Sequence, residues 1–433
     1  MSSLLITNGR IIDPANGRDE IGDLLIVDGR IAPPTALAGL KKPPEKLDAK
    51  GLIVSPGLID LHVHLREPGQ SAKETIATGA KCAAAGGFTS VVCMPNTSPS
   101  VDNASVVTWI LEKAKAEACV NIFPTGALTK GIAGEELAPI GAMFKAGVVA
   151  LTDDGHCIQN HEIMRRACEY AGMFGLTVMD HCQDYNLVGK GVMHEGHVST
   201  ELGLPGWPVI GEELIVARNA LLVDLTGTPI HCQHLSAAGS VRILREARSR
   251  GLPLSGEVCP HHIALTDDTI RMFDTNFKMN PPLRSEEHVD ALIEGIADGT
   301  ITVLASDHAP HNAFEKEVEF DCAPFGILGL ETELALFLDI LVHQRKAISL
   351  SRLIELYTIN PARLLGLDTE ARGRRGTLSE GAVADITLIN PDLEWKVDKA
   401  QSFSRSRNNP FHGWELKGRA VRTIVGGKMA WAL

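Results

Sequence analysis

The feature that most constrains this fold is an alternation of short apolar runs with helical segments through the middle of the chain. Between about residues 51 and 366, most of the runs are separated by stretches rich in Ala and Leu, such as KETIATGAKCAAAGG. Eight strands alternating with helices over roughly 300 residues are typical of an α/β fold of the (β/α)₈ TIM-barrel type. An open, doubly wound sheet is the alternative, because alternation does not show closure. The eight runs span residues 57–64, 88–94, 120–128, 147–153, 176–181, 229–235, 254–260 and 301–308.

The two ends of the chain differ from the middle and resemble each other. Apolar runs flank the pairs Asn8-Gly9, Asp28-Gly29 and Gly426-Gly427, and such pairs favour two-residue hairpin turns, where both central residues need positive φ. A strand-like run, VADITLINPD, precedes the last pair. We therefore expect a small β-sandwich-like domain built from both termini, residues 1–54 and 367–433, around a barrel of residues 55–366.

Composition narrows the functional class. The formal net charge of −12 argues against nucleic-acid binding, which usually requires a basic face. No run approaches the roughly 18 apolar residues of a membrane span, and the first residues lack the pattern of a secretion signal. Nine scattered cysteines without a C-x-x-C pair indicate reduced thiols. We expect a cytoplasmic enzyme with a small-molecule substrate, no nucleic acid and no membrane. The absence of G-x-G-x-x-G and G-x-x-x-x-G-K-[ST] further weakens a nucleotide-binding function.

Two histidines mark the end of the first barrel run. His62 and His64 alternate in DLHVHLREPG, and side chains two apart on a strand point to the same face. Neutral imidazole is a common zinc ligand. A single histidine on an apolar strand is more often a core residue, but this pair favours a metal site.

Further polar residues end four more of the predicted strands. Taken alone, each of these residues is as well explained by a helix cap or a hydrogen-bonded core position. Together with the histidine pair they place four histidines and two carboxylates at the carboxyl ends of five strands, where barrel enzymes keep their active sites. Neighbouring residues compete for these roles, namely Asp153, Asp180, His231 and His308, and alternation along a strand does not settle every pair. The four residues are Asp154, His181, His234 and Asp307.

Several motifs carry a resemblance to a known family. HVHLREPG, MPNTSP, LTDDG, HCQHLS, NPPLR, SDHAPH and APFGILGLET together resemble the dihydroorotases of the long bacterial class, within the amidohydrolase superfamily. The likeness covers nearly the whole chain. H-x-H alone is a superfamily feature, whereas HLREPG with MPNT and DHAPH is much more specific. The resemblance implies reversible zinc-dependent hydrolysis of (S)-dihydroorotate to N-carbamoyl-L-aspartate in pyrimidine (UMP) synthesis.

The resemblance also implies the metal ligands. His62, His64 and Asp307 would hold one zinc ion, and His181 and His234 a second. Many superfamily members bridge the two ions with a carboxylated lysine at the fourth strand, but LTDDG offers none, and Lys145 precedes that strand. Asp154 matches the bridging position. We expect two zinc ions, with a single ion as the alternative because of this departure.

The chemistry requires a proton carrier beside the metal. Zinc lowers the pKa of bound water to about 7 and polarises a carbonyl. A carboxylate next to the attacking water takes its proton and passes it to the departing nitrogen. Asp307 is the candidate for this general base and acid. A ligand set of histidine and aspartate suits an open hydrolytic site better than a closed structural one, which is usually rich in cysteine.

Residues that do not bind metal are candidates for binding the substrate. Arg66 has the geometry to bind a carboxylate with two hydrogen bonds, and the resemblance assigns Arg66, Asn96 and His311 to the substrate carboxylate. It places Asn280 and the backbone of Pro324, Phe325 and Gly326 around the ring. The structural alternatives are a surface salt bridge for Arg66 and turn-stabilising amides for Asn96 and Asn280. We expect His261 and His262 to be structural.

Two groups of rival functions remain. Hydantoinases, dihydropyrimidinases and allantoinases resemble this chain in fold and H-x-H, but they generally use the strand-four lysine, and most lack the set of Arg66, Asn96 and His311. Some dihydroorotase-like chains have lost metal ligands and act as non-catalytic partners of aspartate transcarbamoylase; here all six expected ligands are present. The resemblance implies a homodimer, and association with aspartate transcarbamoylase is compatible with activity.

Overall fold

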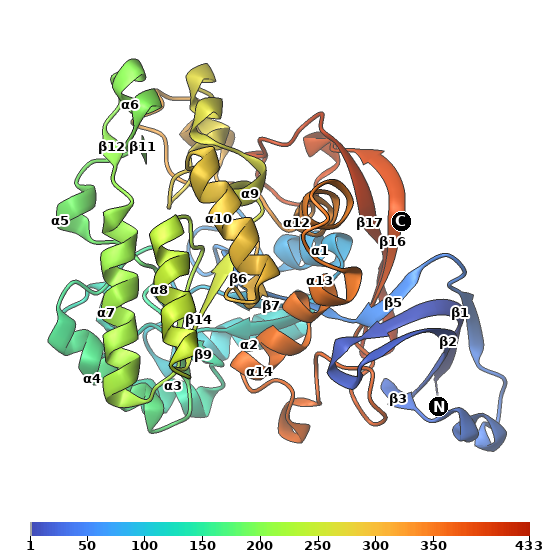
Figure 1. The fold of residues 1–433 in the computed structure, drawn as a ribbon. Helices are drawn as coiled ribbons and strands as arrows, with labels where there is room; N and C mark the ends of the chain where they lie inside the picture. Colours follow the sequence, from blue (N-terminus) through green and yellow to red (C-terminus); the bar gives the residue numbers. More distant parts are fainter. Residues whose placement is uncertain (1) are drawn as a thin grey trace.

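The computed structural model describes residues 2–433 as a parallel barrel with a β-sheet at one side (Figure 1). The predicted alternation in the middle of the chain is confirmed. Most of the barrel strands are buried along their whole length, as expected for parallel strands covered on both faces. The barrel strands are β6 (Leu58–Val63), β7 (Phe88–Cys93), β8 (Asn121–Pro124), β9 (Ala150–Leu151), β10 (Thr177–Asp180), β13 (Ile230–Cys232), β14 (Leu254–Val258) and β15 (Val303–Leu304).

Short bridges close the barrel. Strands β6, β7 and β8 pair in parallel, as do β9, β10, β13, β14 and β15. A bridge from Gly126 to Leu151 joins the two groups at one seam, and a bridge from Val63 to His308 joins them at the other. The second seam includes a hydrogen bond from the His64 N–H to the His308 carbonyl of 2.9 Å. The open, doubly wound alternative is therefore excluded.

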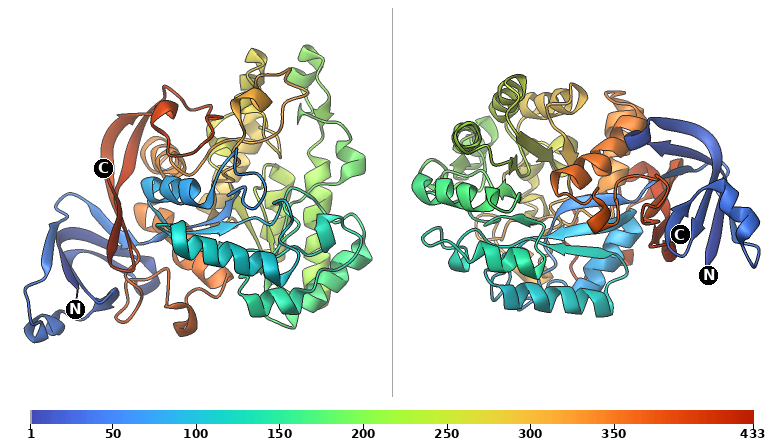
Figure 2. Two further views of the ribbon diagram at one scale, coloured as in Figure 1. Left: turned by 180° about the vertical axis from the view of Figure 1, so that it is seen from behind. Right: turned by 90° about the horizontal axis from the view of Figure 1, so that it is seen from below.

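Helices surround the barrel (Figures 1 and 2). The sequence fixes their ends: α1 begins after Thr75, whose side chain accepts a hydrogen bond from the Thr78 N–H, and it ends at Gly87, where φ is 98°. The helices are α1 (Ile76–Gly86), α2 (Ala104–Glu117), α3 (Ile140–Ala146), α4 (His161–Gly172), α5 (Tyr185–Val188), α6 (His197–Leu202), α7 (Ile210–Thr226), α8 (Ala238–Ser249), α9 (His261–Ala264), α10 (Glu286–Ala297), α11 (Ala313–Lys316), α12 (Glu333–Phe337), α13 (Leu350–Tyr357) and α14 (Ile359–Leu364). Between α5 and α7, a pair of two-residue strands, β11 (Met193–His194) and β12 (Gly206–Trp207), flanks α6.

Strands from both chain ends form the second sheet, as predicted. Its order is β18-β17-β16-β5-β1-β2-β3, with β4 paired to β1. The N-terminal and C-terminal strands of this sheet meet at the antiparallel pair β16–β5, in which Ile386 lies opposite Pro56. The domain boundaries predicted at residues 54/55 and 366/367 stay a prediction. The strands are β1 (Ser3–Asp13), β2 (Arg18–Val27), β3 (Arg30–Ala32), β4 (Glu45–Asp48), β5 (Ile53–Pro56), β16 (Ile386–Lys396), β17 (Glu415–Val425) and β18 (Lys428–Ala432).

Two of the three predicted hairpin turns are present. Asp28-Gly29 joins β2 to β3, and Gly426-Gly427 joins β17 to β18, with positive φ at all four residues. The turn predicted at Asn8-Gly9 is wrong, because β1 continues through it with a shift of register.

The reason lies in what surrounds the Asn8-Gly9 pair. Asn8 adopts φ 61° but donates its side-chain amide to Asp48 (3.0 Å). Gly9 packs so closely on Val54 that a Cβ would lie 2.4 Å from its Cγ2. The left-handed residue thus produces a β-bulge.

Hydrogen bonds to the end of α1, the first helix of the barrel, hold the terminal sheet against the barrel. Thr423 of β17 donates a hydrogen bond to the Ala84 carbonyl (2.6 Å), and Thr387 of β16 donates one to the Gly87 carbonyl (2.6 Å).

All nine cysteines lie within the described residues and are free, as expected. Among residues 2–433, no helix has both the length and the apolar character needed to cross a bilayer.

Candidate active site

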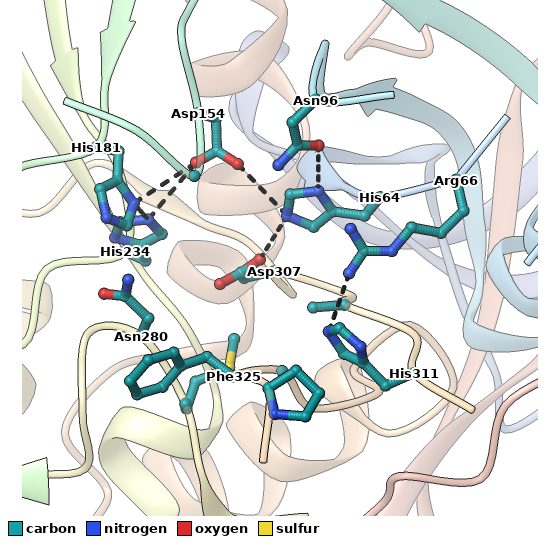
Figure 3. A pocket seen from close by; sticks show the side chains of 15 residues that line it. His64, Arg66, Asn96, Asp154, His181, His234, Asn280, Asp307, His311 and Phe325 are labelled. Atoms are coloured by element: carbon teal, nitrogen blue, oxygen red, sulfur yellow. Dashed lines mark hydrogen bonds and ion pairs between the residues drawn. The ribbon is translucent and has the colours of Figure 1, made fainter. Parts of the chain in front are cut away.

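A cavity of about 310 Å³ opens at the carboxyl ends of the barrel strands. It gathers every predicted site residue except His62, which is fully buried beneath it. Figure 3 shows the side chains converging on this space from different strands. The lining residues are His64, Arg66, Asn96, Asp154, Gly155, His181, His234, Met279, Asn280, Asp307, Ala309, His311, Pro324, Phe325 and Gly326.

Asp154 lies at the centre of the histidines. Its Oδ1 is 3.2 Å from His62 Nε2, 3.7 Å from His234 Nε2 and 3.8 Å from His181 Nδ1. Its Oδ2 is 3.4 Å from His64 Nε2. One carboxylate therefore faces all four imidazoles, which is the arrangement that a bridging ligand requires.

Asp307 approaches the cluster from the other side. Its Oδ1 lies 3.1 Å from His64 Nε2 and 3.5 Å from His62 Nε2. Its backbone is held at φ 44°, and two other site residues, His234 (φ 33°) and Arg66 (φ 61°), also have left-handed backbones. Such conformations are costly for residues other than glycine and concentrate at functional sites.

A buried carboxylate fixes His62 from behind. Glu257 Oε1 lies 2.8 Å from His62 Nδ1, while Oε2 lies 3.0 Å from His231 Nε2. Burial would raise the pKa of Glu257, but hydrogen bonds from His231 and His62 and their charges lower it to about 2. The ionised carboxylate therefore accepts the His62 Nδ1 proton and leaves Nε2 free to bind a cation.

Two other candidate ligand rings, those of His64 and His181, are fixed in the same way. Asn96 Oδ1 accepts a hydrogen bond from His64 Nδ1 (3.0 Å), which leaves His64 Nε2 facing both aspartates. Gln183 Oε1 accepts one from His181 Nε2 (2.9 Å), which leaves His181 Nδ1 between His234 Nε2 (2.8 Å) and Asp154 Oδ1 (3.8 Å). Each ring therefore presents its second nitrogen to the centre of the cluster.

The electrostatics of the cluster favour a cation. Burial opposes a charge on His62, yet the carboxylates of Asp154 and Asp307 raise its pKa well above the ordinary value. Burial, followed by the charge of His234, lowers the pKa of His181 to about 4 and keeps that ring neutral. His62 Nε2 and Asp154 Oδ1 are buried without a hydrogen-bond partner in residues 2–433. Neutral imidazoles with two carboxylates fit a divalent metal ion.

For each pair of neighbouring residues that the sequence left open, the geometry also shows which residue lies outside the cluster. Asp153 accepts hydrogen bonds from the Leu128 and Thr129 N–H groups, outside the cluster. Asp180 pairs with Arg218 at 2.6 Å, and His308 faces Glu74 at 3.4 Å. His231 contacts Glu257 and not the cavity.

Cationic and amide side chains lie on the opposite wall. Arg66 is buried, donates to the Pro310 carbonyl (3.2 Å), and places Nη2 3.4 Å from His311 Nε2. Burial lowers the Arg66 pKa to about 10, so the guanidinium remains charged at neutral pH. Asn280 donates its amide to Gln183 Oε1 (3.1 Å).

The third wall is backbone. Lys316 is buried and donates to the carbonyls of Pro324 (2.8 Å) and Thr275 (3.0 Å). Gly326 donates its N–H to the Lys278 carbonyl (2.9 Å). A Cβ at Gly326 would lie 2.7 Å from His311 Cδ2, so only glycine allows this close approach.

Sequence reasoning missed Glu257, Gln183 and the support from His231. Glu257 did leave a signal, because a charged residue stands inside the otherwise apolar run LSGEVCP. An unpaired buried charge is costly, so a carboxylate in a barrel strand implies a partner. Gln183 left no comparable signal, since it follows its strand in an ordinary polar segment.

The barrel, its terminal sheet and the buried histidine–aspartate cluster define an amidohydrolase. In agreement, residues 51–240 match the family model described as dihydro-orotase-like, and residues 242–430 match that of the amidohydrolase family.

Full-length relatives narrow this class. The chain is 51% identical over 429 residues to a dihydroorotase from Geobacter sp. (strain M21), covering 99% of both chains. It is 52% identical over 426 residues to a dihydroorotase from Pelotomaculum thermopropionicum, covering 98% of both. The chain therefore belongs to the dihydroorotase family.

Solved structures confirm the architecture. An L-hydantoinase (dihydropyrimidinase) from Arthrobacter aurescens superposes with a TM-score of 0.87 at 25% identity, covering 99% of this chain and 96% of that one. A dihydropyrimidinase from Brevibacillus agri gives a TM-score of 0.83 at 22% identity, covering 99% and 94%. At these identities the likeness concerns the fold.

Proposed function

We propose that this chain catalyses the zinc-dependent, reversible hydrolysis of (S)-dihydroorotate to N-carbamoyl-L-aspartate in pyrimidine synthesis in the cytoplasm. One observation carries the proposal: a buried cluster of four histidines and two aspartates, all of which except His62 line one cavity, shares that cavity with the charged guanidinium of Arg66. The cluster suits amide hydrolysis, and the guanidinium suits the carboxylate that distinguishes dihydroorotate from uncharged cyclic amides.

The metal assignment follows the free nitrogens of the cluster. His62, His64 and Asp307 would hold one zinc ion, His181 and His234 the other, and Asp154 would lie between them. The free carboxylate oxygens of Asp154 support two ions over one. When bound, zinc supplies a Lewis acid and lowers the pKa of a water molecule to about 7.

Asp307 carries the proton. Its Oδ1 faces His62 and His64, which leaves Oδ2 available to take a proton from the attacking water. The remaining hydroxyl group joins the amide carbon, the ring C–N bond breaks, and Asp307 returns the proton to the departing nitrogen. In the reverse direction the same carboxylate takes the proton from the nitrogen as the ring closes.

Arg66, Asn96 and His311 orient the substrate carboxylate. Since Asn96 Oδ1 is occupied by His64, its amide nitrogen is the group that donates. Burial, followed by the charges of Arg66 and Lys73, lowers the pKa of His311 to about 2, so a neutral imidazole donates without adding a proton to the site. Asn280 and the backbone of residues 324–326 contact the ring.

The test is hydrolysis of dihydroorotate by purified protein, before and after chelation and after zinc is restored, with bound metal measured in parallel. We expect zinc-dependent turnover of dihydroorotate, two zinc ions per chain, and no turnover of hydantoin, dihydrouracil or allantoin. Turnover of one of the latter in its place would assign the chain to a sister activity. Bound zinc without turnover of any of the four would contradict the proposal.

A further inference from the structure

The connection between β16 and β17 reaches from the terminal sheet to the substrate side of the active site. It carries Asn408, which is 2% exposed. The Asn408 side chain lies against the part of the cavity wall formed by Ala309, His311 and Gly326. This wall therefore depends on a residue that the barrel itself does not supply.

Three backbone groups occupy the amide of Asn408. Its Nδ2 donates to the Ala309 carbonyl (2.9 Å) and to the Gly326 carbonyl (3.0 Å). Its Oδ1 accepts a hydrogen bond from the His311 N–H (3.0 Å). Two carbonyl partners and one N–H partner fix which amide atom is the nitrogen. Among side chains of this length, only asparagine combines two N–H donors with an acceptor.

The three backbone groups belong to two segments that diverge at this point. His308 and Ile327 form a parallel bridge, and the Ala309 N–H donates to the Ile327 carbonyl (2.9 Å). Next to this bridge, the carbonyls of Ala309 and Gly326 cannot bond each other, because both are acceptors. A Cβ at Gly326 would lie 2.7 Å from the Ala309 carbonyl oxygen, so the segments are in close contact. The donor that they share on Asn408 joins them where the bridge ends.

Both segments carry groups proposed to bind the substrate. The first carries His311 and the Pro310 carbonyl, which accepts a hydrogen bond from Arg66 Nε (3.2 Å). Figure 3 shows the Arg66 guanidinium beside the His311 ring. The second segment contains Gly326, part of the backbone wall. Asn408 therefore connects the carboxylate-binding side chains to the wall that faces the ring.

Asn408 is itself firmly held. Ser404 donates a hydrogen bond to the Glu74 carboxylate, and Ser406 Oγ donates one to the Lys73 carbonyl (2.7 Å). Both partners lie in the loop between β6 and α1, which also carries Arg66. The Asn408 carbonyl accepts the Leu328 N–H (3.0 Å). The amide thus projects from a fixed backbone.

Other hydrogen bonds hold the metal side of the bridge. The His64 N–H donates to the His308 carbonyl (2.9 Å), and the His308 N–H donates to Ser306 Oγ (3.0 Å). These bonds fix the strand end that carries Asp307 without help from Asn408. A change at Asn408 should therefore affect the substrate side more than the metal side.

We propose that Asn408 is a positioning residue for substrate binding. Its amide holds residues 309–311 and 324–326 at the spacing at which Arg66, His311 and the backbone wall contact one substrate molecule. The inference rests on the proposed function, because the groups that Asn408 positions are those proposed to bind dihydroorotate.

Kinetics of Asn408→Asp would separate substrate binding from chemistry. The carboxylate keeps an acceptor for the His311 N–H but turns its second oxygen toward two carbonyl oxygens. The KM for dihydroorotate should rise about tenfold or more, the loss of roughly one hydrogen bond to a charged group. The kcat should change by less than about threefold, because binding and not the chemical step is weakened, and bound zinc should match the wild type.

The matched control is Asn409→Asp, which adds the same charge one residue later. Asn409 Oδ1 accepts the Phe411 N–H (2.8 Å), a hydrogen bond that a carboxylate retains. This variant should keep the wild-type KM. An equal rise of KM in both variants, or a loss of kcat or zinc in Asn408→Asp as large as the change in KM, would overturn the inference.

Hydrogen exchange gives a readout that needs no turnover. In Asn408→Asp, and to a smaller extent in the uncharged Asn408→Ala, the amides of residues 308–311 and 326–328 should exchange faster than in the wild type. The amides around His181 and His234 should keep their rates. Asn408→Ala provides the measurement if the charged variant does not fold, and unchanged exchange at residues 308–311 would overturn the inference. A wild type that hydrolyses a different cyclic amide would instead overturn the proposed function, and exchange would still decide the role of Asn408.

Discussion

Within residues 2–433, buried side chains with ligand atoms close enough to hold a metal occur at three places, and the two that contain more than one histidine differ in almost everything else. One is the active-site cluster. The other is formed by Cys259, His261 and His262 where β14 leads into α9. In the second cluster and in two triads of the first (His62, His64 and Asp307; His62, Asp154 and His234), the residues are buried and the ligand atoms lie within 4.8 Å of one another. Proximity of ligand types therefore does not distinguish them.

Charge, support and access do distinguish them. At the active site, two carboxylates raise the pKa of His62, whereas burial, followed by the charge of His262, holds the pKa of His261 well below its ordinary value. Active-site rings are held by Glu257, Asn96 and Gln183, but neither nitrogen of His261 has a hydrogen-bond partner in residues 2–433. None of the three residues of the second cluster lines the active-site cavity. A working metal site needs compensating charge, oriented ligands and room for a substrate.

The largest effect should come from Asp307→Asn. The amide retains an oxygen that can contact His64 but cannot carry the proton, so kcat should fall by about 10²–10⁴-fold. The protein should still fold and retain much of its metal. Steady-state kinetics and metal analysis on the same sample would check this. Near-normal turnover would show that another group moves the proton.

Glu257→Gln tests the importance of ring support. The substitution keeps the shape of a fully buried side chain but removes the charge that holds His62 Nδ1 and His231 Nε2. We expect metal affinity to fall by about 10–100-fold, as for other partners of metal-binding histidines. Competition with a chelator of known affinity would measure it, and activity should return at saturating zinc. Unchanged affinity would mean that the ligand cluster orients itself.

Arg66→Lys should act on the substrate side alone. A lysine keeps the positive charge but cannot bind a carboxylate with two parallel hydrogen bonds. The KM for dihydroorotate should rise about tenfold, the loss of about one charged hydrogen bond, with the metal content unchanged. Loss of zinc in this variant would place Arg66 in the support of the metal cluster.

The smallest effect is expected at the second cluster. His261→Gln and Cys259→Ser should leave the number of bound zinc ions and the zinc dependence of turnover unchanged, because this cluster lacks a carboxylate. The matched variant His234→Gln should remove about one zinc ion per chain. Loss of zinc from both positions would show that proximity of ligands is sufficient after all.

The sequence predicted which side chains gather around the cavity better than it predicted the residues that support them. Barrel strands are buried on both faces and read as apolar runs, so polar residues at their ends, such as His62 and Asp307, are conspicuous. Glu257 supports His62 from a strand 195 positions later, and no local pattern links the two. The turn predicted at Asn8-Gly9 failed for a related reason, since the pair forms a turn or a bulge depending on Val54 and Asp48, which lie on other segments.

The junction of β5 with β16 has a consequence for biosynthesis. These strands pair although about 330 residues separate them. At 5–20 residues per second, a ribosome needs tens of seconds to make the intervening chain. During that time β5 has an open strand edge, which is a site for wrong pairing. The sheet can therefore close only late in synthesis, and a chain that ends before residue 386 lacks β16 and leaves this edge of β5 unpaired.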